Sequence, residues 1–254
     1  MDAAKDHSRL FSPVAGAYAQ FRPRYPEALF DHLTALVPHR QFAWDAGCGS
    51  GQATLGLADR FVNVLGTDIN AAQIAAAPAH PHVVYRVGPE KASGLEAGSV
   101  ALVTVAQALH WFDLDAFHAE VQRVLTPRGV IAAWSYGVVR LQEPVLDEIV
   151  QHFYRDVVGP FWPAERRHVE NDYRDLPFPY AELTAPSFDM EVHWHLPQFL
   201  GYLGSWSATA RYIAANQQDP TVTLAERLLP AWGDPYQSRV IRWPLALRIG
   251  RLGG

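Results

Sequence analysis

Between Gln41 and Tyr136, short apolar runs alternate with longer amphipathic stretches, and this alternation constrains the fold more than any other feature of the chain. Such a pattern is typical of βαβ units on a parallel sheet. It predicts helices over 52–60, 71–77 and 114–125. The predicted parallel strands are Phe42–Asp45, Val62–Thr67, His82–Val87, Val100–Ala106 and Gly129–Tyr136.

Beyond Tyr136 proline and aromatic residues become dense and the alternation fades. Apolar spacing predicts helices over 143–158, 198–205, 208–217 and 222–232. Two late segments, 187–196 and 239–249, read as strands. We expect these two strands to pair antiparallel at the sheet edge, with the helices between them over the carboxyl ends of the parallel strands.

The length of 254 residues fits one large domain with an elaborated cap. Hydrophobic residues make up 49% and charged residues 19%, so a globular core is expected. A net charge of -5 gives no basic field for phosphates, which disfavours a nucleic-acid partner. The polar start, the absence of an apolar run of ~20 residues and the single Cys48 predict a cytoplasmic protein with no membrane partner.

A glycine-rich segment follows the first predicted strand and opens a helix. It has the spacing Asp45-x-Gly47-x-Gly49-x-Gly51, which differs from the dinucleotide fingerprint and from the phosphate loop. Gln52 stands where the phosphate loop has its lysine. A glycine loop without that lysine, opened by an acid, suits a cationic ligand with an amino-acid end, and its glycines let the backbone approach that ligand.

Asp68 ends the second predicted strand, beside this loop. A carboxylate there can accept two hydrogen bonds from ribose hydroxyls, with Ile69 packed on the adenine. This geometry alone does not separate NAD from S-adenosylmethionine. The structural alternative is that Asp68 simply caps the helix expected from Ala71.

The glycine loop, Asp68 and the segment Gln107-Ala108-Leu109-His110-Trp111 together resemble the class I S-adenosylmethionine-dependent methyltransferases. Within them the chain is similar to the type 11 branch, which includes trans-aconitate methyltransferase-like proteins. The resemblance implies an α/β, Rossmann-like sheet of seven strands, mostly parallel with the last strand antiparallel, and a helical cap. It also implies S-adenosylmethionine as methyl donor, S-adenosylhomocysteine as product and a small-molecule acceptor.

The resemblance covers nearly the whole chain and implies one methyltransferase domain over 1–254. We expect an N-terminal helical arm over the cofactor (1–40), a cofactor-binding core (41–136), a substrate cap with a late strand (137–238) and a C-terminal strand (239–254). One departure stands at Gly88-Pro89-Glu90, where the family usually has an acid followed by Ala-Glu. Proline has no N–H, so adenine recognition is expected to rest more on Ile69 and Glu90.

The candidate site residues fall into two groups. The expected cofactor-binding residues are Tyr18, Arg22, Asp45, Gly47, Gly49, Gly51, Asp68, Ile69, Glu90 and Gln107. The expected acceptor residues are Tyr25, His110, Trp111 and Trp206. No metal is expected, because His193 and His195 have no identifiable third ligand.

His110 is the candidate catalytic residue, and its role depends on the acceptor. A carboxylate is already ionised at pH 7 and needs no base, so His110 would be a donor or a wall. A phenol or an amine must lose a proton, which His110 could take. The third interpretation is a packed histidine with no catalytic role.

Three functions from different classes compete. The first is methyl transfer to a small organic molecule, with a carboxylate oxygen as the favoured acceptor. The second is a non-catalytic S-adenosylmethionine-binding module. The third is an NAD-dependent oxidoreductase, which the glycine spacing and the lack of a Tyr-x-x-x-Lys pair disfavour. A monomer or a homodimer is expected.

Overall fold

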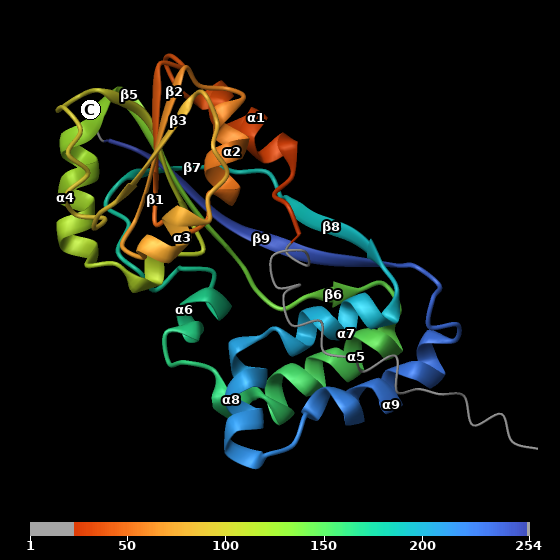
Figure 1. Cartoon of the computed structure of the whole chain (residues 1–254). Helices are drawn as coiled ribbons and strands as arrows, with labels where there is room; N and C mark the ends of the chain where they lie inside the picture. Colours follow the sequence, from red (N-terminus) through yellow and green to blue (C-terminus); the bar gives the residue numbers. More distant parts are fainter. Residues whose placement is uncertain (1–22, 253–254) are drawn as a thin grey trace, which may run out of the picture. The chain divides into compact units, whose positions relative to one another are not determined.

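The structure, a computed structural model, describes residues 23–252, and these form two compact units (Figure 1). The core unit comprises 24–137, 165–190 and 244–252 of the described residues. The helical unit comprises 138–164 and 191–243, together with Pro23. The predicted site residues Tyr18 and Arg22 lie outside the described residues.

Five parallel strands form the sheet of the core unit, in the order β3-β2-β1-β4-β5. Their bounds are β1 Phe42–Ala46, β2 Asn63–Asp68, β3 Val83–Val87, β4 Val100–Ala106 and β5 Leu125–Tyr136. All five predicted strands are confirmed. Strand β5 begins earlier than predicted, because it continues through a register shift opposite Val100, with Arg128 in the left-handed region at φ 65°.

The long C-terminal strand β9 (Arg239–Arg251) pairs antiparallel with β5, from Leu245 opposite Tyr136 to Arg251 opposite Val130. The predicted antiparallel last strand is therefore confirmed. Strands β7 (Ala181–Leu183) and β8 (Asp189–Trp194) also pair with β9, and so does β6 (Arg140–Leu141).

Within residues 23–252 the sheet has nine strands, and the expected number of seven is corrected. The two additional strands, β6 and β7, contain two and three residues. Such segments are too short to show an alternation of apolar and polar residues, and their strand conformation comes from pairing with β9.

Helices of the core unit lie on both sides of its parallel strands, with α4 on one side and α1 and α2 on the other (Figure 1). Their bounds are α1 Glu27–Leu36, α2 Gln52–Ala58, α3 Ala71–Ala75, α4 Leu114–Val124 and α6 Arg166–Glu170. Helix α4 shows why they pack: Asp113 caps its first turn, and Phe117, Val121 and Val124 form one fully buried face.

The helical unit contains α5 (Pro144–His152), α7 (Leu196–Gly204), α8 (Ser207–Asn216) and α9 (Pro220–Trp232). The predicted helix over 143–158 changes after His152 into a π-helical turn, Phe153–Val157, and the 3₁₀ turn Gly159–Phe161 follows. No helix within residues 23–252 is long and apolar enough to span a bilayer.

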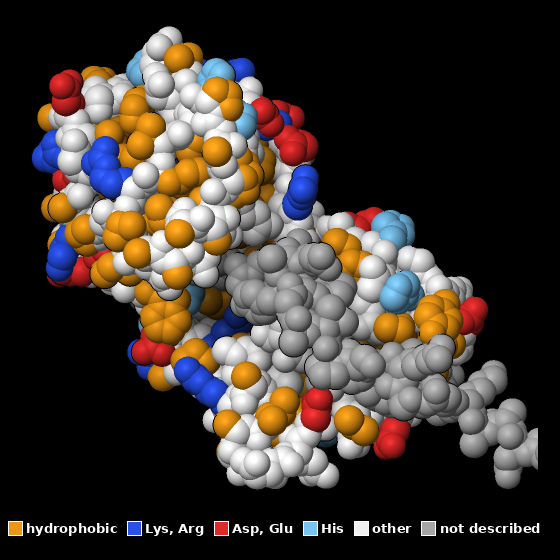
Figure 2. All heavy atoms as spheres, viewed as in Figure 1, with side chains coloured by type: hydrophobic (Ala, Val, Ile, Leu, Met, Phe, Trp, Pro, Cys, Tyr) orange, Lys and Arg blue, Asp and Glu red, His pale blue; other side chains and the backbone are white. Residues whose placement is uncertain are grey.

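Acidic and basic side chains are interspersed on the face of the core unit shown in Figure 2. Several large apolar side chains of this unit are also exposed, among them Ile69, Val84 and Trp111. Two of these, Ile69 and Trp111, belong to the predicted site.

Candidate active site

The glycine loop joins β1 to α2 and turns through three left-handed residues: Gly47, Gly49 and Gly51 have φ values of 67°, 55° and 86°. A Cβ at Gly47 would lie 2.7 Å from the Cβ of Ala108, and one at Gly51 would overlap the ring of Tyr85. The protein's own packing therefore requires glycine at these two positions. A Cβ at Gly49 would meet only the Oε1 atom of Gln73, at 3.8 Å, so the backbone at Gly49 borders open space.

Asp68 supports this loop. Its Oδ2 atom accepts a hydrogen bond from the Gly49 N–H at 2.8 Å, and its Oδ1 atom accepts one from the Asn70 N–H at 2.8 Å. The N-cap of α3 is Asn70, whose side chain accepts from the Ala72 and Gln73 N–H groups, so the capping interpretation of Asp68 is wrong. The half-buried carboxylate keeps lone pairs for further donors.

Asp45 lies beneath the loop and is fully buried. Its two carboxylate oxygens accept the hydroxyl groups of Thr54 at 2.6 Å and Thr104 at 2.8 Å. Burial raises the pKa of Asp45 to about 6, although these hydrogen bonds act in the opposite direction. Asp45 thus ties the glycine loop to α2 and β4, and the geometry gives it a structural task.

Around the loop, Ile69 is 78% exposed, with an apolar face free for a flat ligand. Glu90 accepts a hydrogen bond from the Asp113 N–H at 3.3 Å. Gln107, with a φ of 60°, donates from Nε2 to the Tyr136 carbonyl at 3.1 Å, which links the ends of β4 and β5.

His110 and Trp111 lie in the 3₁₀ turn Leu109–Trp111 that follows β4. The His110 Nδ1 atom lies 2.9 Å from the hydroxyl oxygen of Tyr173, and the Trp111 side chain is exposed. Burial, with a smaller effect of the cation Arg166, lowers the pKa of His110 to about 4. His110 is therefore neutral at pH 7 and a weak base.

Residues 44–133 match the family model described as a methyltransferase domain. A Dictyostelium discoideum protein named as a methyltransferase is 32% identical over 225 residues, covering 87% of this chain and 86% of that protein. A solved structure described as a type II methyltransferase from Anaeromyxobacter dehalogenans is 46% identical, with a TM-score of 0.88, covering 92% of this chain and 99% of that one. The chain belongs to the class I S-adenosylmethionine-dependent methyltransferases.

A relative from Saccharomyces cerevisiae, named as an S-adenosylmethionine-dependent methyltransferase, is 29% identical over 244 residues, with 81% of this chain and 82% of that protein covered. Membership of the S-adenosylmethionine-dependent methyltransferases makes S-adenosylmethionine the cofactor of this protein. The open space at Gly49, the half-buried Asp68 and the exposed Ile69 fit such a ligand. The resemblance to trans-aconitate methyltransferase-like proteins stays a prediction.

Two of the predicted acceptor residues, Tyr25 and Trp206, pack against other aromatic side chains of the methyltransferase. Tyr25 is 7% exposed and packs edge to face on Trp134 and Phe30 of the core unit. Trp206 is half-buried in the helical unit, where it packs against an aromatic cluster. That cluster consists of Phe153, Tyr154, Trp162 and Tyr202.

Tyr173 and Arg166 were missed at the level of the sequence. Both lie in 165–190, a segment of the core unit that follows the helical-unit segment 138–164 in the sequence. No sequence motif marks either residue. Their proximity to His110 comes from the tertiary fold, so residue spacing carried no signal for it.

Proposed function

We propose that this methyltransferase transfers the methyl group of S-adenosylmethionine to a carboxylate oxygen of a small organic acid. The observation that carries the proposal is the state of His110, whose pKa of about 4 makes it a poor acceptor for the proton of a phenol or an ammonium group. A carboxylic acid has lost its proton at neutral pH. A carboxylate therefore needs no base.

S-adenosylmethionine supplies an electrophilic methyl group on a sulfonium ion. In this proposal the backbone of the glycine loop around Gly49 borders the cofactor, the Asp68 carboxylate accepts the ribose hydroxyls, and Ile69 packs on the adenine. Asp68 also fixes the loop through the Gly49 N–H, so one carboxylate serves both the loop and the ligand. Asp45 acts through the loop rather than by contact.

On the acceptor side, the protein's task is to align the nucleophile and exclude water. Trp111 and His110 follow β4 at the strand ends, where sheets of this kind bind ligands. Arg24 is exposed, and with Arg22 it is proposed to hold the acceptor's negative charge, as an arginine fork matches a carboxylate. Tyr18 stays a proposed cofactor-binding residue, and Tyr25 and Trp206 stay proposed acceptor residues.

The test is a methylation assay with the full-length protein and matched acceptors that share one carbon skeleton and carry a carboxylate, a phenol or a primary amine. Release of S-adenosylhomocysteine above the no-acceptor background reports turnover. We expect turnover with carboxylates, and a kcat that is nearly flat from pH 6 to 9. Turnover confined to phenols or amines, with a rate that rises with pH, contradicts the proposal.

A further inference from the structure

The pair formed by His110 and Tyr173 is held by an unusual backbone turn. Asp172 and Tyr173 have φ values of 55° and 59°, in a region that residues other than glycine rarely occupy. Two successive residues in this strained conformation are stable only where contacts with the surrounding structure hold them there.

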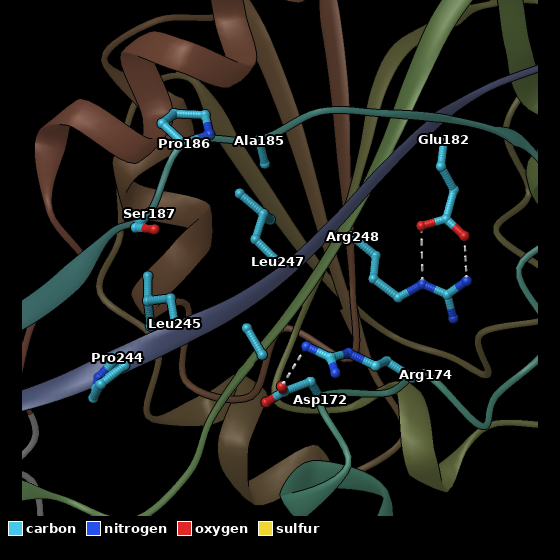
Figure 3. Close-up of a pocket in the computed structure, with 11 residues that line it drawn as sticks. Asp172, Arg174, Glu182, Ala185, Pro186, Ser187, Pro244, Leu245, Leu247 and Arg248 are labelled. Carbon is cyan, nitrogen blue, oxygen red and sulfur yellow. Dashed lines mark hydrogen bonds and ion pairs between the residues drawn. The ribbon is translucent and has the colours of Figure 1, made fainter.

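The surroundings of this turn include a clamp from strand β9. The Nη1 atom of Arg248 donates to the carbonyl oxygens of Tyr173 at 2.8 Å and Leu176 at 2.9 Å. The same guanidinium binds the carboxylate of Glu182, and Asp172 is paired with Arg174 (Figure 3). The Tyr173 N–H also donates to the His168 carbonyl at 2.8 Å. The Tyr173 backbone is therefore held by hydrogen bonds on both sides of its Cα atom.

The hydrogen bond between the two side chains has two possible directions. Tyr173 is fully buried, and among the described residues its hydroxyl has only the Nδ1 atom of His110 as a partner. If Nδ1 carried the proton, it would donate to the phenol, and the hydroxyl proton would be left in the interior without an acceptor. Buried donors are rarely left so, because the loss of hydration is not recovered. Donation from Tyr173 to Nδ1 satisfies both groups.

A second pair in the core unit has the same arrangement. The hydroxyl of Tyr180 lies 2.8 Å from the Nδ1 atom of His118, and the His118 Nε2 atom lies 3.0 Å from the Pro177 carbonyl oxygen. A carbonyl only accepts, so Nε2 of His118 carries the proton and Nδ1 accepts from the tyrosine. In His110 the Nε2 atom has no hydrogen-bond partner among residues 23–252.

We propose that Tyr173 is a positioning residue that holds His110 in the tautomer with the proton on Nε2, so that His110 offers the acceptor a hydrogen-bond donor and no basic nitrogen. The donor role of His110 toward the acceptor rests on the proposed carboxylate acceptor, whereas the tautomer can be measured without any acceptor. Charged or titratable groups near His110 are Arg166, His168 and Glu165, all from the segment of α6. Their effects on His110 are smaller than that of burial.

The first experiment is nitrogen-15 NMR of the full-length protein at pH 7, with two-bond correlations that report which imidazole nitrogen is protonated. The His110 signals are assigned by their loss in His110→Gln, and His118 serves as the internal reference for the Nε2–H tautomer. We expect the His110 pattern to match that of His118. A protonated Nδ1, or an unbiased mixture of tautomers, overturns the proposal.

The second experiment compares Tyr173→Phe with Tyr180→Phe, a matched variant that removes the same hydroxyl from the other pair. Tyr173→Phe is expected to convert His110 into a mixture of tautomers, whereas Tyr180→Phe leaves the signals of His110 unchanged. A His110 that keeps a pure Nε2–H pattern in Tyr173→Phe contradicts the positioning role. If Tyr173→Phe does not fold, the wild-type pattern alone decides.

Kinetics separate this inference from the proposed function. With a carboxylate acceptor, Tyr173→Phe is expected to lower kcat by about 3- to 10-fold, the effect of weakening one hydrogen bond, with an unchanged KM for S-adenosylmethionine. If the tautomer result holds and carboxylates are not methylated, the proposed acceptor is wrong and the positioning role stands.

Discussion

The buried layer of the core unit and the ends of its strands use the same types of side chain in different ways. Asp45 and His118 are buried, and each has both polar atoms hydrogen-bonded inside the protein. Asp68 and His110, at the strand ends, are half-buried. Asp68 binds the loop with lone pairs to spare, and one ring nitrogen of His110 has no partner among residues 23–252.

The difference shows that position, and not residue type, separates structural from functional candidates here. A buried polar group must find its partners within the protein, because an unmet one is costly. A half-buried group at the end of a strand can leave capacity for a ligand. We therefore expect substitutions in the buried layer to act on stability, and those at the strand ends to act on binding and turnover.

The largest effect is expected for His118→Ala. The substitution removes a buried ring and leaves the Tyr180 hydroxyl and the Pro177 carbonyl without their partner, which should lower the free energy of unfolding by about 3–5 kcal/mol. Urea denaturation followed by circular dichroism measures this change. In the matched His110→Ala variant the ring removed is half-buried and only the Tyr173 hydroxyl loses its partner, so the loss should be smaller, about 1–2 kcal/mol. An equal loss of unfolding free energy in the two variants would contradict the distinction between the buried layer and the strand ends.

The next effect is a pH dependence of stability caused by Asp45. Its pKa is about 6 in the folded protein, above the ordinary value of 3.8, so the folded state binds this proton more tightly than the unfolded state. The stability that this group contributes is therefore greatest below pH 4 and is lost as the pH rises through 6.

Asp45→Asn tests this pH dependence, because it keeps a polar group for the two threonines and removes the titration. The free energy of unfolding of Asp45→Asn, relative to wild type, should rise by about 2–3 kcal/mol between pH 4 and pH 7. Urea titrations of both proteins at the two pH values measure it. A pH-independent difference would show that Asp45 is ionised in the folded protein throughout this range.

At the strand ends, Asp68→Ala should weaken S-adenosylmethionine binding by about 1.5–3 kcal/mol, the range for hydrogen bonds to a charged group. Isothermal titration calorimetry measures the affinity, and thermal denaturation measures the fold. The melting temperature should fall only modestly, since the Gly49 and Asn70 N–H groups become accessible to water. Unchanged affinity with a lower melting temperature would show that Asp68 acts on stability alone and does not bind the cofactor.

The smallest effect is expected for His110→Ala in turnover of a carboxylate. A lost donor should lower kcat by about 3- to 10-fold, and the pH profile from 6 to 9 should stay flat. Steady-state release of S-adenosylhomocysteine measures both. A loss near the ~10²- to 10⁴-fold expected for a general base would contradict the proposed acceptor and the assigned tautomer together.

Much of the fold follows from local patterning. The strand before the glycine loop, the left-handed glycines and the acid at the end of β2 are all encoded within residues 42–68. The structure also removes the alternative interpretation of Asp68 as a helix cap, because Asn70 lies nearer to α3 and takes the capping position. Strands β6 and β7 could not be predicted, since their conformation depends on a partner that is distant in sequence.

The sequence by itself determined the parallel core, the glycine loop and the place of Asp68, because periodicity and turn chemistry are local properties of the chain. The cofactor class followed from the resemblance of its motifs to those of the methyltransferases. Only the tertiary structure decided which groups surround His110. Tyr173, which lies 63 residues from His110 in the sequence, binds the His110 ring. Arg248, which lies a further 75 residues along, binds the Tyr173 carbonyl. The protonation of an imidazole depends on the burial and partners that such distant segments supply, and these have no signature in local sequence.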